Sequence, residues 1–166
     1  MMVIKYHFYR QFVVVDMIEL YDGALDVAKI TSRWYEEESS NNFGAYIPFI
    51  GTVRDENSID GLSFDIYEPI LLQWFESWQQ KAKEKNAILK MAHSKGDVLL
   101  HQSSYIAAVF SPKRRVALDM IDEFVEDFKA NAPIWKYDLI NGNRVYAKDR
   151  STKINGSGLL GTNNAN

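Results

Sequence analysis

The chain has 166 residues, of which 46% are hydrophobic, so we expect one compact domain with a core that needs no cross-links. It contains no cysteine, which excludes disulfides, thiolate zinc sites and a cysteine nucleophile. The net charge of −3 gives no electrostatic reason to expect a nucleic acid or an anionic membrane as a partner.

The first apolar run is FVVVDMIEL, at residues 12–20. Its alternation predicts a strand, and it is too short and too acidic to span a bilayer. No pattern of small residues typical of a cleavage site closes it, so we expect no signal peptide and a cytoplasmic protein. Residues 1–16 form an extension, and the sequence leaves open whether it is ordered. The sequence also leaves open whether the chain starts at Met1 or Met17.

A first helix is predicted next, with Asp22 as its N-cap and its start near Ala24. The residues expected to share one face are Ala24, Val27, Ala28 and Thr31. The acidic run at residues 36–42 is predicted to be a solvated loop after the helix.

The middle of the chain predicts two strands and a second helix. Residues 43–53 are rich in aromatic and branched side chains, and Pro48 within them indicates an edge strand or a bulge. A polar loop at residues 54–61 leads to an alternating strand at residues 62–68. A helix is expected from Pro69, with an apolar stripe formed by Leu71, Trp74, Phe75, Trp78 and Ala82.

The next segments predict two strands, at residues 87–94 and 103–110, with a turn at residues 95–97 after the first. A third helix follows, with Ser111 as N-cap and Pro112 at its first position. Its predicted buried face comprises Ala117, Ile121, Phe124 and Phe128. Pro133 is expected to end this helix.

A hairpin is predicted from residues 133–140 and 144–148, because Asn-Gly lies between them. The Gly/Asn/Ser-rich residues 151–166 are expected to be a flexible tail, which leaves residues 17–150 as the main domain. This order of elements predicts an α+β fold with mixed or antiparallel sheets.

Three cations occupy the start of the third helix, at Lys113, Arg114 and Arg115. This is the positive end of the helix dipole, where cations are unfavourable and anions bind. One interpretation is a receptor for phosphate or carboxylate. The other is a set of solvated cations that pair with Asp119 or Asp122.

Lys129 and Lys136 lie on either side of the helix-breaking Pro133. Lys129 is either a cation that stabilises the helix C-terminus or a functional amine. Lys136 is either an edge cation or, beside Trp135, a lysine whose pKa is lowered toward the range useful in proton transfer. Arg54, after the strand at residues 43–53, is either an anion clamp or a surface cation.

No metal site is expected, because the three histidines have no ligand spacing and His93 alone is more typical of a structural residue. The chain also lacks a dinucleotide loop after a strand, a Walker loop and a nucleophile elbow.

Four segments together resemble the molybdopterin synthase catalytic-subunit family: FGAYIPFIGTVRDEN, HSKGDV, FSPKRR and KANAPIWKYD. The resemblance covers roughly residues 17–150. It implies an α/β hammerhead core with an added antiparallel β subdomain. It also implies an enzyme that transfers two sulfurs to cyclic pyranopterin monophosphate, forming the dithiolene of molybdopterin without a bound cofactor or metal.

The resemblance further implies a small ubiquitin-like partner whose C-terminal Gly-Gly carries the sulfur as a thiocarboxylate. This chain would form a homodimer at the centre of a heterotetramer. The absence of cysteine agrees, because sulfur cannot travel on a persulfide of this chain. Two rival hypotheses are a non-catalytic module that binds a pterin or phosphate, and an interaction protein that uses residues 43–50 as a docking edge.

The resemblance implies site residues at the positions that match the family's motifs. Lys129 and Lys136 fall on the two catalytic lysines of the family. The substrate-binding positions are Thr52, Val53, Arg54, Lys113, Arg114, Lys129, Lys136, Tyr137, Asp138 and Lys148. The family usually has histidine where Lys113 stands, so a titratable imidazole is lost there. Ser94 stands where arginine is common, and Lys95 is the expected substitute.

Overall fold

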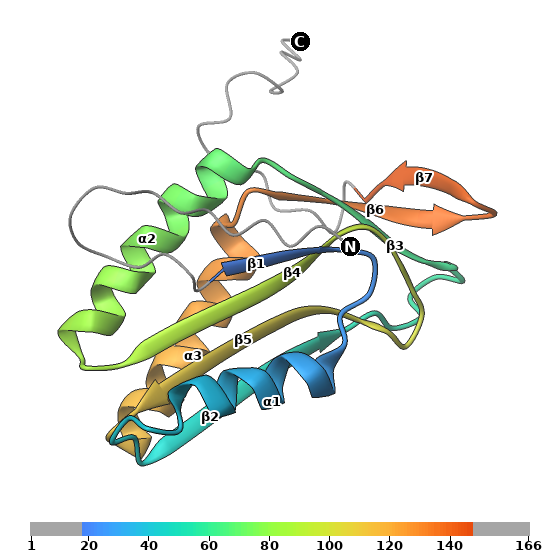
Figure 1. Ribbon diagram of the computed structural model, residues 1–166. Coiled ribbons are helices and arrows are strands. Elements are labelled where there is room, and N and C mark those ends of the chain that lie inside the picture. Colours follow the sequence, from blue (N-terminus) through green and yellow to red (C-terminus); the bar gives the residue numbers. More distant parts are fainter. Residues whose placement is uncertain (1–17, 148–166) are drawn as a thin grey trace, which may run out of the picture.

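The computed structural model describes residues 18–147. They form seven strands and three helices (Figure 1). In chain order these are β1 (Ile18–Asp22), α1 (Val27–Glu38), β2 (Ala45–Thr52), β3 (Gly61–Ile66), α2 (Glu68–Glu84), β4 (Ile88–Leu99), β5 (Ser103–Ser111), α3 (Arg114–Asn131), β6 (Ile134–Ile140) and β7 (Asn143–Tyr146). The predicted extension at residues 1–16 and the tail lie outside this range.

One long strand joins two parts of the sheet, whose order is β2-β5-β4-β3-β6-β7. The first half of β4 pairs with β5, and its last residues, Gly96–Leu99, pair with β3. β1 runs parallel to β4, and the other pairs are antiparallel. The predicted α+β fold with a mixed sheet is therefore confirmed, with β3, β6 and β7 as the added antiparallel part.

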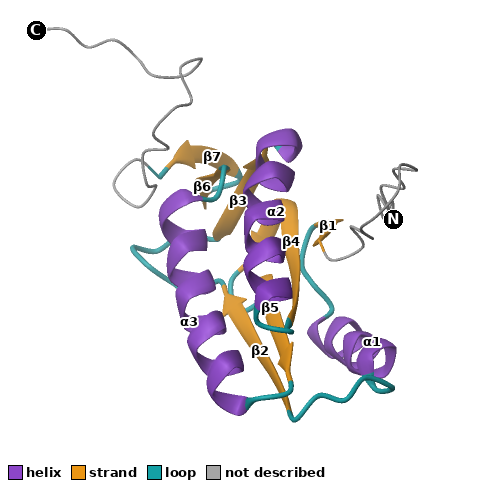
Figure 2. Ribbon diagram, turned by 90° about the vertical axis from the view of Figure 1, so that its left-hand side faces the viewer, coloured by secondary structure: helices purple, strands orange, loops and turns teal. Residues whose placement is uncertain are grey.

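Helices cover both faces of the sheet (Figure 2). α2 and α3 pack with β4 and β5 in the larger core, while α1 packs on the opposite face of the same strands. The predicted stripes of α2 and α3 are confirmed: Leu71, Phe75, Trp78, Ala82, Ala117, Ile121 and Phe124 are buried, and Trp74 and Phe128 pack against them. No helix within residues 18–147 is long and apolar enough to cross a membrane.

Two further predictions about strands are confirmed. β2 pairs only with β5 among the described strands, so Pro48 lies on an edge strand, and the register shifts after Gly51. The hairpin of β6 and β7 turns at Asn141 and Gly142, which have φ values of 51° and 74°. Two positive φ values are typical of a type I′ turn, for which Asn-Gly is the preferred sequence.

The start of α1 was predicted wrongly. Asp22 ends β1, and the N-cap is Asp26, whose carboxylate accepts a hydrogen bond from the Lys29 backbone N–H. The buried residues of the helix are Ile30 and Trp34, not the face that was predicted. The part of the predicted strand at residues 12–17 lies outside the described residues.

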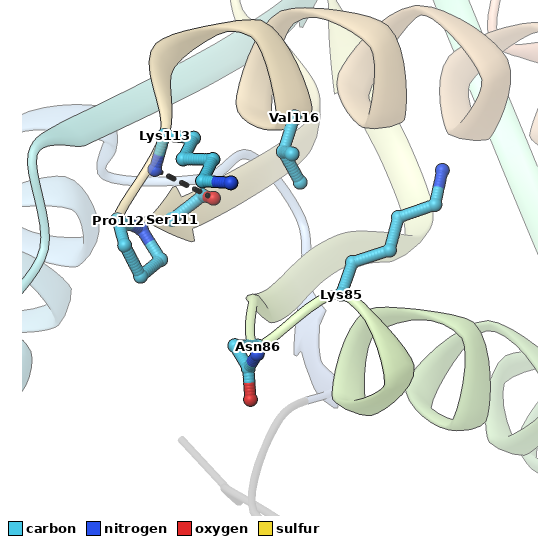
Figure 3. Close-up of a pocket in the computed structure, with 6 residues that line it drawn as sticks. All are labelled: Lys85, Asn86, Ser111, Pro112, Lys113 and Val116. Carbon is cyan, nitrogen blue, oxygen red and sulfur yellow. Dashed lines mark hydrogen bonds between the residues drawn. The ribbon is translucent and has the colours of Figure 1, made fainter.

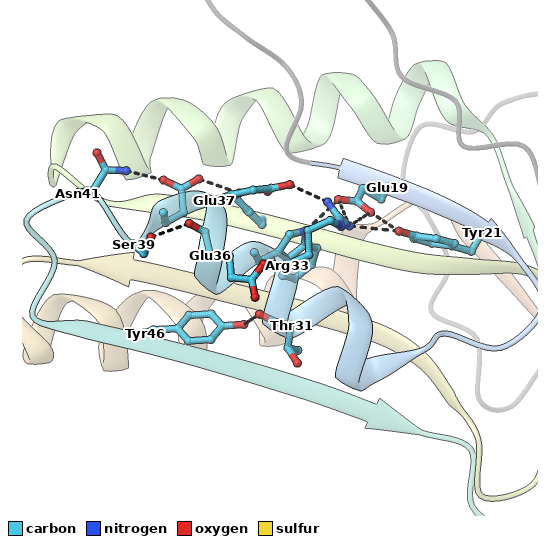
Figure 4. Close-up of polar contacts among 12 residues, drawn as sticks. Glu19, Tyr21, Thr31, Arg33, Glu36, Glu37, Ser39, Asn41 and Tyr46 are labelled. Atoms are coloured by element: carbon cyan, nitrogen blue, oxygen red, sulfur yellow. Dashed lines mark hydrogen bonds and ion pairs between the residues drawn. The ribbon is translucent and has the colours of Figure 1, made fainter.

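The loop predicted at residues 36–42 begins later than expected, because α1 continues through Glu38 and only residues 39–42 form an exposed turn. Lys90 of β4 exposes only 4% of its surface, and its Nζ lies 2.8 Å from Glu37 Oε2 and 2.7 Å from Glu38 Oε1. Arg33 joins Glu37 to Glu19 of β1 (Figure 4). Burial acts to raise the pKa of Glu37, but the hydrogen bond and charge of Lys90 lower it overall.

Two local predictions around β4 and α3 were also wrong. Residues 95–97 are not a turn but part of β4, which changes partner there at Gly96 (φ 70°). Ser111 is the last residue of β5, and its hydroxyl accepts from the Lys113 N–H. α3 begins at Arg114, with Lys113 in the N-cap position.

We predict that Gly61→Ala destabilises the fold, because β3 and β4 approach closely at this position. A Cβ at position 61 would lie 2.4 Å from the backbone oxygen of Val98. Overpacking of this kind costs about 1–3 kcal/mol. Thermal and urea unfolding would measure the loss. Gly142→Asn is the control, since its Cβ meets nothing within 4 Å and asparagine tolerates positive φ. An equal effect of both changes would contradict the prediction.

Candidate functional site

Three of the sequence-predicted cations lie at the two ends of α3, the long helix beside α2 in Figure 2. Lys113 and Arg114 begin the helix and Lys129 lies in its last turn. At about 1.5 Å per residue, the 16 positions from Lys113 to Lys129 span about 24 Å along the helix axis. One small substrate molecule cannot contact both ends within one copy of the chain.

The C-terminal end of α3 lies against the end of β2. Phe128 stacks on Tyr105 of β5 with ring centroids 4.1 Å apart, and Tyr105 pairs with Gly51 of β2. Thr52 then ends β2 and is exposed. The residues that continue from Thr52 therefore lie at the same end of the domain as Lys129.

Val53 anchors the segment that leads to Arg54. Its side chain is 2% exposed and packs in a small apolar cluster with Phe64 and Val98. Its N–H donates to Gln102, and its carbonyl accepts from His101. The packing of the Val53 side chain and its backbone hydrogen bonds hold the chain in place immediately before Arg54.

Arg54 is exposed, with 82% of its side chain accessible, and it forms an ion pair with Glu56. An exposed pair of this kind contributes little to stability, typically less than about 1 kcal/mol. The guanidinium is therefore held near the strand end without being buried. Its exposure leaves it accessible to an anion.

Lys136 lies on β6, directly opposite Phe64 of β3 in the antiparallel register, and is half-buried. Phe64 belongs to the same apolar cluster as Val53, so Lys136 lies beside the segment that leads to Arg54. Asp138 shares the face of β6 with Lys136 because side chains alternate along a strand.

Tyr137 lies on the other face of β6. The Arg144 guanidinium lies 4.1 Å from the centre of its ring, and Tyr146 packs against its edge. Burial and the neighbouring Asp65 carboxylate raise the pKa of Tyr137 above its usual value. The structure thus separates Tyr137 from Lys136 and Asp138. Lys148 lies outside the described residues.

A pocket of about 300 Å³ lies at the other end of α3 (Figure 3). Its lining comprises Lys85, Asn86, Ser111, Pro112, Lys113 and Val116. Lys85 follows the end of α2 and lines the same pocket as Lys113, so the lining contains two cations. The sequence signal for Lys85 is a run of lysines at residues 81–85, which says nothing about the distance from α3.

The structure also bears on three other features considered from the sequence: Arg115, Lys95 and a possible metal site. Arg115 pairs with Asp119, at 3.5 Å, as the solvated interpretation expected. Lys95 pairs with Glu68 at 3.2 Å, so it is engaged within the fold. Within residues 18–147, no cluster of histidine and acidic side chains could hold a metal ion.

The fold and these positions define a class of protein: an α+β domain with two groups of cations at opposite ends of one helix. Comparisons with known proteins then give the family. The family model described as MoaE protein matches residues 20–131. The chain belongs to this family.

Two relatives come from Helicobacter pylori strain 26695. Its molybdopterin synthase catalytic subunit is 52% identical over 144 residues, which cover 87% of this chain and 99% of the relative. A solved structure described as a protein–protein complex of subunits 1 and 2 of molybdopterin-converting factor matches with a TM-score of 0.81 at 52% identity. That match covers 86% of this chain and 98% of the solved chain.

A more distant structure supports the fold alone. Molybdopterin synthase from Staphylococcus aureus matches with a TM-score of 0.66 at 21% identity, over 76% of this chain and 93% of that one. The fold as a whole is therefore shared with a chain of widely diverged sequence.

Proposed function

We propose that this chain is the catalytic subunit of a molybdopterin synthase. It transfers sulfur from a thiocarboxylated small subunit to cyclic pyranopterin monophosphate, which makes the dithiolene of molybdopterin. The observation that carries the proposal is the 52% identity with the catalytic subunit of Helicobacter pylori over nearly the full length of that relative. The proposal also places the chain in the cytoplasm.

The proposed protein partner is a small ubiquitin-like subunit with a C-terminal Gly-Gly thiocarboxylate. The solved complex of two subunits of molybdopterin-converting factor supports this partner. Because this chain has no cysteine, the sulfur must arrive on another molecule. Nucleic acid and membrane have no place in the reaction.

The proposed active site is shared between two copies of this chain. Lys129 and Lys136, with Arg54 and Asp138, form one part at the C-terminal end of α3. Lys113 and Arg114 form the other part, about 24 Å away along the same helix. A second copy that presents its α3 N-terminus to the first copy's lysines completes the site. The central homodimer of a heterotetramer provides this arrangement.

In the proposed reaction, the cations Arg54, Lys113 and Arg114 hold the substrate phosphate. The thiocarboxylate sulfur bonds to a carbon of the pterin side chain as a bond from that carbon to oxygen breaks, and the oxygen leaves with a proton. The other bond of the sulfur still links it to the carbonyl carbon of the partner. Water then cleaves that link, leaving sulfur on the pterin and a carboxylate on the partner. A second loaded partner repeats the step.

The two lysines have complementary roles in this proposal. Lys129 stabilises the oxyanion that develops at the thioester carbonyl, and Lys136 moves protons. Thr52 and Val53 set the position of Arg54 at the end of β2. Tyr137 is a supporting residue on the far face of β6, and Lys148 is a further candidate for substrate contact.

The test mixes the purified chain with the thiocarboxylated small subunit and cyclic pyranopterin monophosphate. Mass spectrometry is expected to find the doubly sulfurated pterin, with two partner carboxylates formed for each product. Binding of the pterin without sulfur transfer would instead identify a non-catalytic binding module. Absence of both binding and transfer would contradict the proposal.

A further inference from the structure

His93 is a buried polar side chain that the proposed reaction does not use. It lies on β4, exposes 2% of its surface and is surrounded by three aromatic rings from three other elements. Its ring centroid lies 5.0 Å from Phe64 of β3, 5.8 Å from Tyr105 of β5 and 5.5 Å from Phe128 of α3. His93 therefore touches both parts of the sheet and the end of α3.

Two of these rings lie next to the proposed catalytic lysines. Phe128 directly precedes Lys129 in the last turns of α3. Phe64 is the cross-strand partner of Lys136, and such partners lie on the same face of a sheet. His93 thus packs against the supports of both amines.

The orientation of the imidazole is fixed by one hydrogen bond. Nδ1 lies 2.8 Å from the carbonyl oxygen of Ser94. A carbonyl only accepts, so Nδ1 carries the proton and donates it. Because burial lowers the pKa of His93 to about 4, the ring is neutral at neutral pH and adds no charge near the lysines.

We propose that His93 is a positioning residue, whose ring sets the distance between Lys129 and Lys136 by packing against both Phe128 and Phe64. This inference rests on the proposed function for its catalytic consequence, but the geometry that it predicts is independent of the reaction. His93 acts through the packing of its ring and contacts no substrate atom.

The physical reason is that the two lysines belong to different parts of the fold. Lys129 is exposed in the last turn of α3. Lys136 belongs to the added antiparallel part, which joins the main core through the end of β4. Aromatic pairs hold their partners in defined orientations, and misplacing a reacting group by about 1 Å can cost about 10²-fold in rate.

Two substitutions test the packing of the His93 ring and its hydrogen bond separately. His93→Asn keeps a donor near the position of Nδ1 but removes the packing against Phe64 and Phe128. His93→Phe keeps an aromatic ring and removes the donor. Both variants are used as full-length chains, with circular dichroism and thermal unfolding to show that they are folded.

The first measurement does not depend on activity. A short amine-reactive cross-linker is expected to join Lys129 to Lys136 in the wild-type chain, and peptide mass spectrometry quantifies the product. The internal control is the pair formed by Lys81, in the last turn of α2, and Lys85, the C-cap residue that follows it. His93→Asn is expected to lower the Lys129–Lys136 yield several-fold relative to the control pair, and His93→Phe is expected to preserve it. Unchanged yield in His93→Asn, or no such product in the wild type, would overturn the inference.

The second measurement is steady-state kinetics with the loaded small subunit. His93→Asn is expected to lower kcat by about 10- to 100-fold with little change in KM, and His93→Phe is expected to recover most of the loss. An equal loss of kcat in His93→Phe would show that the imidazole nitrogens act directly and would overturn the positioning role. If the wild type has no transferase activity while the cross-linking results hold, the proposed function fails and the positioning role stands.

Discussion

Lys129→Ala is expected to lower the rate of sulfur transfer by about 10²–10³-fold, the usual cost of removing one donor to a developing oxyanion. Binding of the small subunit should change little, because the interaction that is lost forms in the transition state. Single-turnover reactions with the thiocarboxylated partner, followed by mass spectrometry of the pterin product, would measure the rate. Titration of the partner would measure its affinity separately.

Lys83→Ala is the matched control for this change. Lys83 is an exposed lysine in the last turn of α2, as Lys129 is in the last turn of α3. If Lys129 only stabilises the helix C-terminus, both substitutions cost about 0.3–1 kcal/mol of stability and leave sulfur transfer intact. Near-normal transfer by Lys129→Ala would therefore remove this residue from the proposed mechanism.

The parts of the fold that sequence reasoning predicted well are those with a local cause. The buried faces of α2 and α3 follow from apolar residues spaced at three and four positions, and both were confirmed. The turn at Asn141 and Gly142 was confirmed because that dipeptide suits positive φ at both positions. These signals depend on neighbours in sequence, so a single chain is enough to find them.

Two of the errors have long-range causes. The acidic end of α1 looks solvated in sequence because its partner, Lys90, lies 53 positions after Glu37. Residues 95–97 carry turn signals, but Gly96 allows β4 to continue and to change its partner from β5 to β3. Neither the buried ion pair nor the change of strand partner has a periodic pattern in the sequence.

In the candidate site, too, local features could be predicted from the sequence and long-range ones could not. The roles of Lys129 and Lys136 came from the family resemblance, because each lysine alone also suits a structural explanation. The distance from Lys113 to Lys129 followed from helix length once α3 was known to be unbroken. The presence of Lys85 in the same pocket as Lys113 depends on how α2 and α3 pack, which the sequence does not show.

Mixing two inactive variants is expected to restore activity if the site is shared between two copies. One variant carries Lys113→Ala with Arg114→Ala, and the other carries Lys129→Ala with Lys136→Ala. In a mixed dimer of two-fold symmetry, one site receives all four changes and the other receives none. Dimers purified through a different tag on each copy should therefore reach about half of the wild-type rate per dimer.

The control combines Lys129→Ala on one copy with Lys136→Ala on the other. These two lysines lie at the same end of α3, so each site of that mixed dimer keeps one defect and activity should stay low. A site complete within one chain predicts no restoration in either mixture. Full activity of the Lys113 and Arg114 variant by itself would remove the second group of cations from the site. Restoration in the first mixture alone requires that the 24 Å gap along α3 is closed by a second copy of the chain.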